Sequence, residues 1–217
     1  MSTILFDLDG TLTDSGEGII NCAIIALEHF GLPIPSREEL RVFVGPPLHD
    51  TFIKFGVPAD KTDEAIAIYR SRYIPIGKFE NTPYQGIREM LEILQKKGHK
   101  LFVATSKPET TAIEILEHFD LAKYFKQICG AAMDRSRVNK EDVIAYLLNQ
   151  NDASDKIIMV GDTAFDVIGA KKHSIPTIGV SWGYGSVQEM EAAGAAAIVH
   201  TPDELLSRLE CNNVSYQ

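Results

Sequence analysis

From about residue 83 onward, short apolar segments alternate with segments whose apolar residues recur at helical spacing. Short apolar runs that end in turn residues predict buried strands, and the chain also begins with one. Alternating strands and helices imply right-handed crossovers and a parallel sheet covered by helices on both faces. We therefore predict an α/β fold with a doubly wound, Rossmann-like parallel sheet. The predicted strands are residues 3–7, 99–105, 156–161 and 176–180, with 196–200 as a weaker fifth.

The segment between the first strand and the second, residues 14–82, shows only helical patterns. Because ligands of such sheets bind beyond the carboxyl ends of the strands, an insert at this point is placed to act as a lid. We expect residues 1–13 and 83–217 to form the α/β core and residues 14–82 to form a small helical cap. The predicted helices are residues 16–30, 37–44, 48–55 and 61–76 in the cap and 86–97, 109–119, 140–149, 164–173, 187–193 and 202–209 in the core.

The acidic composition limits the partners of this chain. Its formal net charge is -9, which repels nucleic acid polymers and anionic membrane surfaces on average. No apolar segment approaches the roughly 20 residues that a membrane-spanning helix needs. Cys22, Cys129 and Cys211 are far apart and include no C-x-x-C pair. We expect a cytoplasmic protein that acts on a small molecule, and the sequence leaves the oligomeric state open.

Polar side chains lie where the predicted strands end, namely Asp7 and Asp9, Thr105, and Asp162 with Asp166. Each alone is explained by a turn or a helix cap. Together they bring four carboxylates to one rim of one sheet, where like-charge repulsion is costly unless a hard cation with oxygen ligands lies among them. Mg²⁺ is the cation that this pattern favours.

These residues resemble the motifs of a known family. Residues 7–11 (DLDGT), Thr105, Lys140 and residues 161–166 (GDTAFD) match, in order and context, the four motifs of the haloacid dehalogenase (HAD) superfamily. The second aspartate of the first motif is typical of the phosphatase-type members. The helical insert resembles a small helical cap, and the match extends over essentially the whole chain.

Three further segments resemble phosphoglycolate phosphatases and the related bacterial 5'-nucleotidases. They are residues 6–18 (FDLDGTLTDSGEG), 44–48 (VGPPL) and 181–186 (SWGYGS). The resemblance implies a phosphoric monoester hydrolase that acts on a small phosphorylated metabolite, with phosphoglycolate and 5'-nucleotides as the leading candidates.

The resemblance also implies catalytic and metal-binding roles. Asp7 would attack phosphorus and form an aspartyl phosphate, and Asp9 would act as general acid and then as general base. The Asp7 carboxylate, the Asp9 backbone carbonyl and Asp162 would hold Mg²⁺, with Asp166 bracing this set of ligands.

Thr105, Ser106 and Lys140 are the candidates for holding the phosphoryl group. Thr105 offers a hydroxyl, and we expect the backbone N–H groups near Ser106 to open a helix whose positive end suits a phosphate. Lys140 begins a predicted helix, where the helix dipole disfavours a cation, so that a nearby anion would explain its position. Lys107 is a rival for this role.

The cap would recognise the rest of the substrate. By the resemblance, the corner that begins at Gly45 faces the active site, with Arg41 as a neighbour. Phosphoglycolate would require a cation and a nucleoside an aromatic shelf, and the cap carries residues of both kinds. Trp182 either packs near the site or shields a strand end. A sugar phosphomutase, a phosphotyrosine phosphatase and a non-catalytic binding protein are the alternatives.

Overall fold

The computed structural model describes residues 1–134, 136–151 and 156–210. The chain divides into two compact units. The first comprises Met1–Thr13 and Pro83–Gln217, and the second comprises Asp14–Thr82. Within the described ranges, no helix combines the length and the apolar character that a membrane crossing requires.

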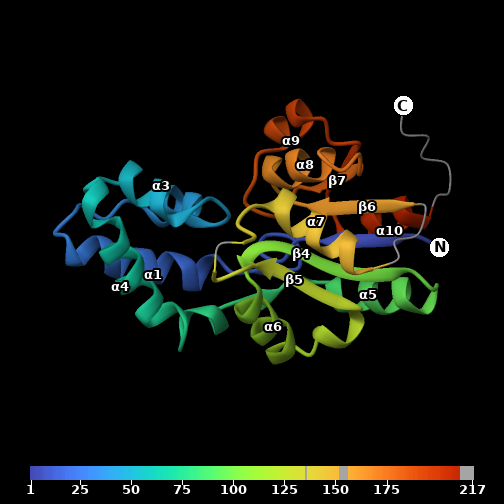
Figure 1. The fold of residues 1–217 in the computed structure, drawn as a ribbon, viewed down its shortest axis with the longest axis horizontal. Coiled ribbons are helices and arrows are strands. Elements are labelled where there is room, and N and C mark those ends of the chain that lie inside the picture. Colours follow the sequence, from blue (N-terminus) through green and yellow to red (C-terminus); the bar gives the residue numbers. More distant parts are fainter. Residues whose placement is uncertain (135, 152–155, 211–217) are drawn as a thin grey trace. The chain divides into compact units, whose positions relative to one another are not determined.

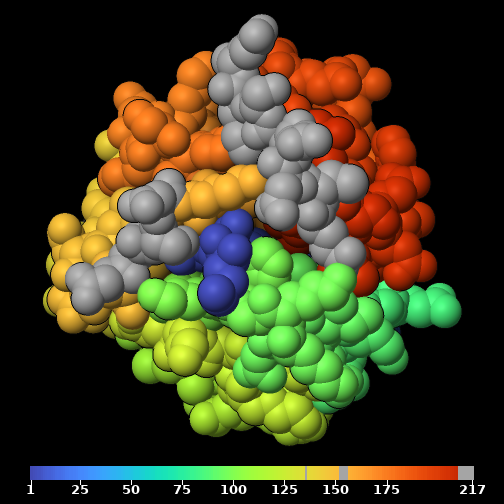
Figure 2. Space-filling view, turned by 90° about the vertical axis from the view of Figure 1, so that its right-hand side faces the viewer, coloured from blue at the N-terminus to red at the C-terminus, as the bar shows by residue number. Residues whose placement is uncertain are grey.

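The first unit contains a six-stranded parallel sheet in the order β5-β4-β1-β6-β7-β8. The predicted α/β, doubly wound fold is confirmed. In Figure 2 the N-terminal residues (blue) emerge between green and orange segments, in agreement with the central place of β1 between β4 and β6. The strands are β1 Thr3–Phe6, β4 Lys100–Pro108, β5 Gln127–Ala131, β6 Ile157–Gly161, β7 Thr177–Val180 and β8 Ala197–Val199.

Helices cover both faces of this sheet (Figure 1). Alternate β1 side chains point to opposite faces, so that Ile4 and Phe6 join one buried cluster and Leu5 joins another. The first cluster includes side chains of α5, α6 and α10, and the second includes side chains of α7 and α8. The helices of this unit are α5 Ile87–Lys96, α6 Glu109–His118, η4 Ala122–Tyr124, α7 Lys140–Gln150, α8 Ala164–Lys171, α9 Val187–Ala193 and α10 Pro202–Glu210.

The strand order reverses at β1. The chain passes from β1 to β4 and β5 on one side and then returns to β6 on the other side of β1. Sheets of this kind bind ligands at such a switch point, beyond the carboxyl ends of the strands. The topology therefore favours a site where β1, β4 and β6 end.

The second unit is helical and has its own aromatic core. The ring of Phe43 lies 5.0 Å from those of both Phe52 and Phe55. Its helices are α1 Gly16–His29, α2 Arg37–Leu40, η1 Arg41–Phe43, α3 Leu48–Lys54, η2 Ala59–Lys61, α4 Thr62–Tyr73 and η3 Gly77–Phe79. The chain passes from one unit to the other at β2 Thr13–Asp14 and at β3 Thr82–Pro83, two short strands that pair with each other.

A balanced ion pair lies at the end of this helical unit. The Arg72 guanidinium donates two hydrogen bonds to the Glu80 carboxylate, at 2.7 and 2.6 Å. Asn21 donates a third bond to Glu80 at 3.2 Å. Arg72 lowers the pKa of Glu80 below its ordinary value. We call Asn21, Arg72 and Glu80 the Arg72–Glu80 cluster.

Two parts of the sheet differ from the sequence prediction. Strand β5 was not predicted, although residues 128–131 of its sequence QICGA are apolar. Strand β4 continues three residues beyond the predicted end at Thr105, with a register irregularity between Ala104 and Pro108. Cys22 and Cys129 are buried free thiols, and Cys211 lies outside the described residues.

Candidate functional site

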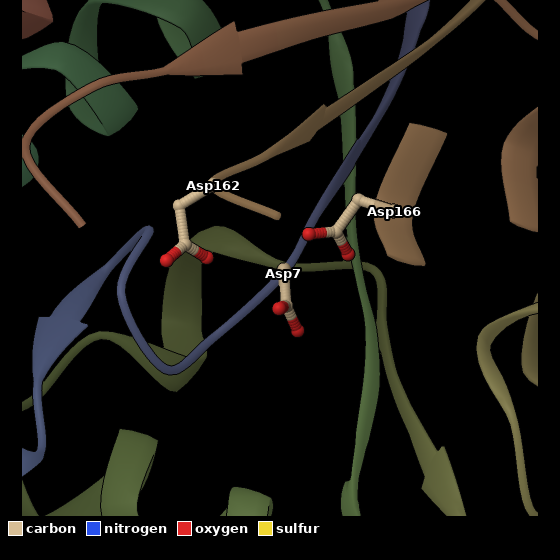
Figure 3. Close-up of side chains that lie close together, drawn as sticks. All are labelled: Asp7, Asp162 and Asp166. Carbon is tan, nitrogen blue, oxygen red and sulfur yellow. The ribbon is translucent and has the colours of Figure 1, made fainter. Parts of the chain in front are cut away.

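Neighbouring strands bring the aspartates together at the predicted rim. Asp7 follows β1 and Asp162 follows β6, and these strands pair in parallel with Phe6 opposite Val160. Asp166 lies in the first turn of α8. One carboxylate oxygen from each of the three aspartates lies within 4.8 Å of the others (Figure 3).

Lys140 lies against these carboxylates. Its Nζ is 2.7 Å from Oδ1 of Asp7 and 2.7 Å from Oδ1 of Asp166, and it donates a hydrogen bond to the Ala104 carbonyl at 2.8 Å. The side chain is only 4% exposed. Helix α7 begins at Lys140 as predicted, and Gly169 of α8 leaves room for it, because a Cβ there would lie 2.8 Å from the Lys140 Cβ.

We call Asp7, Asp162, Asp166 and Lys140 the site cluster. Its charges do not balance. The pKa of Asp7 is raised to about 6, because burial and the neighbouring charge of Asp166 together outweigh the lowering effect of Lys140. Burial and the charges of Asp166 and Asp7 also raise the pKa of Asp162 well above its ordinary value. Burial alone would lower the pKa of Lys140, but Asp166 and Asp7 raise it. Three carboxylates face one ammonium group, which leaves negative charge uncompensated. This arrangement fits the binding of an additional divalent cation that prefers oxygen ligands.

Asp162 is held by residues that the sequence analysis did not assign. It is fully buried, and its oxygens accept hydrogen bonds from the Thr11 hydroxyl at 3.3 Å and the Tyr184 N–H at 2.8 Å. A Cβ at Gly10 or Gly183 would lie 2.1 or 2.3 Å from Asp162 Oδ2. The glycines of the DGT and WGYG segments are therefore the sequence signal for this close packing.

Trp182 packs near the site. Its indole Nε1 donates a hydrogen bond at 3.1 Å to the backbone carbonyl of Thr11, in the turn that also contains Asp9. Its ring meets that of Tyr84 edge to face, with centroids 6.4 Å apart. Trp182 therefore ties the loop after β7 to the turn after β1, which is the first of the two alternatives that the sequence left open.

The surroundings of Thr105 correct one prediction. Thr105 is buried, but Ser106 lies within β4 and does not open a helix, since α6 begins at Glu109. The reason is Pro108, which disfavours helical backbone at Lys107 and itself precedes the first helical residue. The Thr105 hydroxyl accepts a hydrogen bond from the Lys107 N–H at 3.3 Å.

Asp9 is not one of the three clustered aspartates, and its partner is a different lysine. Its Oδ2 is 2.6 Å from the Nζ of Lys107, and the two side chains are 14% and 6% exposed. The structure thus separates the two rival lysines, because Lys140 contacts Asp7 whereas Lys107 contacts Asp9. The sequence identified Lys107 only as a competitor for the role of Lys140.

The remaining candidates, Arg41 and Gly45, belong to the second unit. Arg41 forms an ion pair with Glu38 at 3.8 Å and is 45% exposed. Gly45 has a φ of 104°, which favours glycine at this corner between η1 and α3. Their contact with a substrate stays a prediction.

The family of the chain follows from comparison with known proteins. Residues 4–180 match the family described as haloacid dehalogenase-like hydrolase. The chain belongs to this family. The resemblance that the sequence analysis stated is thereby confirmed.

Individual relatives and solved structures indicate the activities found within this family. A 5'-nucleotidase of Pseudomonas aeruginosa is 42% identical over 191 residues, which cover 87% of this chain and 86% of the relative. The tyrosine-protein kinase PtkA of Mycobacterium tuberculosis is 41% identical over 209 residues, 95% of this chain and 72% of the relative. A crystal structure described as a predicted phosphatase from Clostridium acetobutylicum superimposes with a TM-score of 0.90 at 43% identity, covering 96% of this chain and 97% of that one. This HAD-family protein is a phosphatase, a hydrolase of phosphoric monoesters.

Proposed function

We propose that this HAD-family protein is a magnesium-dependent phosphatase that hydrolyses a small phosphate monoester through an aspartyl phosphate on Asp7. The observation that carries the proposal is the site cluster at the switch point of the sheet. There Asp7, the candidate nucleophile, is buried and lies 2.7 Å from Lys140. Two further carboxylates lie close by, and one lysine cannot neutralise all three. Buried groups with such raised pKa values are typical of active sites.

The side chains divide the reaction into two steps. An oxygen of Asp7 attacks phosphorus while the bond to the leaving oxygen breaks, and Asp9 gives that oxygen a proton so that a neutral alcohol departs. A water then attacks phosphorus and gives its proton to Asp9, the bond to Asp7 breaks and inorganic phosphate leaves. Lys140 orients Asp7, and Thr105, Ser106 and Lys140 hold the phosphoryl oxygens.

The Asp7 carboxylate, the Asp9 backbone carbonyl and Asp162 would hold Mg²⁺. Asp166 accepts hydrogen bonds from the Thr163 N–H and hydroxyl at 3.0 and 2.8 Å, which fits a bracing role. Bound Mg²⁺ would supply positive charge to the phosphoryl oxygens and to the carboxylates that Lys140 leaves uncompensated.

The substrate class is the finer part of the proposal. The relative named a 5'-nucleotidase supports nucleoside monophosphates, whereas the phosphoglycolate phosphatase named among similar structures is only 20% identical. The helical unit offers no free shelf from Phe43 and Phe52, which are buried in its own core. We propose 5'-nucleotides and phosphoglycolate as the first substrates to compare, with Arg41 and the corner at Gly45 as the candidate contacts.

Phosphate release from a panel of monoesters tests the proposal. The panel contains 5'-mononucleotides, phosphoglycolate, sugar phosphates and phosphotyrosine, each with Mg²⁺ and with chelator. We expect Mg²⁺-dependent release that Asp7→Asn lowers by at least about 10⁴-fold, since the nucleophile is lost. The highest kcat/KM identifies the substrate class.

The matched control is Asp60→Asn, at an exposed aspartate of the helical unit, which should leave release unchanged. Release that survives Asp7→Asn, or no release from any monoester, would contradict the proposed mechanism. Transfer of the phosphoryl group to another hydroxyl of a sugar phosphate instead of to water would indicate a phosphomutase.

A further inference from the structure

Stability alone is a weak explanation for the ion pair between Lys107 and Asp9. Both side chains are nearly buried, at 6% and 14% exposure, and their charged atoms are 2.6 Å apart. Removing two charges from water costs several kcal/mol per ion, and the mutual attraction often does no more than offset this cost. A pair of this kind beside the reacting groups therefore suggests a role in the reaction.

The backbone fixes the place of Lys107. Strand β4 runs beside β1, and its register with β5 on the other side shifts between Ala104 and Pro108, the part of the strand that contains Lys107. Irregularities of this type re-aim side chains and are frequent next to active sites. The Lys107 N–H is bonded to the Thr105 hydroxyl, and the next residue is a proline. Lys107 thus extends from a constrained segment of backbone.

The two oxygens of Asp9 differ in their surroundings. Oδ2 accepts from Lys107, whereas Oδ1 is buried and has no hydrogen-bond partner in the described part of the protein. A buried oxygen without a partner is costly, and such groups are retained where a catalytic role uses them. The contact at Oδ2 orients the carboxyl group and leaves Oδ1 for a reacting atom.

We propose that Lys107 is a positioning residue for Asp9. It holds Oδ2, so that Oδ1 is the oxygen that gives the proton to the leaving group as the bond to phosphorus breaks. Oδ1 later takes a proton from the attacking water. This inference rests on the proposed function of the site.

Leaving groups of different basicity test the inference. p-Nitrophenyl phosphate releases an anion that needs no proton, whereas a simple alkyl phosphate depends on the general acid. We expect Lys107→Met to lower kcat/KM for the alkyl phosphate by about 10²–10³-fold and for p-nitrophenyl phosphate by less than about 10-fold. Lys107→Arg, which keeps a charged donor, should recover part of the loss. If Lys107 had a purely structural role, Lys107→Met would lower kcat/KM for both substrates by the same factor.

A double-mutant cycle tests whether Lys107 acts through Asp9. On the alkyl phosphate, Lys107→Met added to Asp9→Asn should cause less than about a 3-fold further loss, because the group that it positions is already gone. Losses that multiply, or an equal loss on both substrates, would overturn the inference and assign Lys107 to the substrate or the fold.

Two controls keep the result interpretable. Turnover of p-nitrophenyl phosphate by Lys107→Met shows that the variant is folded. If Lys107→Met does not fold, Lys107→Gln takes its place in both experiments. A wild-type protein that cleaves neither ester would contradict the proposed function, and with it the role of Lys107. An active wild type with a uniform loss in the variant would contradict the role of Lys107 alone.

Discussion

The two units each contain a buried or half-buried polar cluster, and the two clusters are built on opposite rules. In the Arg72–Glu80 cluster one carboxylate meets one guanidinium through two hydrogen bonds, and the pKa of Glu80 falls. In the site cluster three carboxylates meet one ammonium, and the pKa of Asp7 rises to about 6. The first arrangement is complete by itself, whereas the second lacks positive charge. The difference indicates that the second cluster is shaped for a ligand and not for stability.

Charge balance therefore separates a structural ion pair from a functional one better than proximity does. Distances are similar in the two clusters, at 2.6 Å for Arg72 to Glu80 and 2.7 Å for Lys140 to Asp7. What differs is the sign of the carboxylate pKa shift. Neutralising a carboxylate should accordingly have opposite consequences for stability in the two clusters.

The largest effect is expected from Lys140→Met, which removes the only cation of the site cluster. Three buried carboxylates would then repel one another without compensation, at a cost of about 3–5 kcal/mol in the free energy of unfolding. Turnover should fall by at least about 10³-fold, because Asp7 loses its orienting partner. Denaturant unfolding with chelator and phosphate release with Mg²⁺ measure the two effects.

Lys96→Met is the matched control, since Lys96 is 72% exposed and pairs with Glu92 within α5. Its unfolding free energy should change by less than about 0.5 kcal/mol. Equal stability of the Lys140 and Lys96 variants would show that the site cluster does not need the ammonium.

The next largest effect is an increase, not a decrease, in the free energy of unfolding. Without metal, Asp7→Asn should stabilise the protein at pH 7 by about 3 kcal/mol, because the pKa of Asp7 is raised from 3.8 to about 6 on folding. A raised carboxyl pKa means that the folded state binds the proton more tightly. The wild type therefore loses this stability as the pH rises from about 4 to about 6, and the variant does not.

Thermal unfolding in chelator at pH 4, 5, 6 and 7 checks this prediction. The melting temperatures of wild type and variant should agree at pH 4 and diverge above it, with the variant higher by several degrees at pH 7. A constant difference at all four pH values would mean that the effect does not come from ionisation of Asp7. Asp60→Asn should follow the wild type throughout.

These comparisons also show how far the sequence could lead. The alternation of apolar runs and helical periods predicted the parallel sheet, because the strands β1, β6 and β7 are buried on both faces. Asp7 and Asp162 could be expected at one rim because the carboxyl ends of parallel strands share an edge. Helix α7 begins at Lys140 as expected, because Asn139 and Asp142 form a capping box.

Features that depend on contacts between distant segments were not accessible. Strand β5 is short and contains Gly130, and its pairing with β4 is what defines it. The partner of Lys107 depends on the irregular end of β4, which extends past Thr105, the predicted end of the strand. Thr11 and the Tyr184 N–H meet at Asp162 only because two glycine-containing loops approach each other in the fold.

The smallest effect is expected in the balanced cluster. Glu80→Gln should lower the free energy of unfolding by about 1 kcal/mol at pH 7, because Arg72 and Glu80 are both partly exposed, at 24% and 27%. The folded-state pKa of Glu80 is lowered, so the stability it contributes is present above the unfolded value of about 4.5 and is lost as the pH falls below it. Wild type and variant should therefore converge towards acid pH, where the Glu80 carboxyl is neutral in both states. For Asp7→Asn the wild type is the less stable protein at pH 7, and for Glu80→Gln it is the more stable one. If Glu80→Gln were instead stabilising at pH 7, charge balance would no longer distinguish the two clusters.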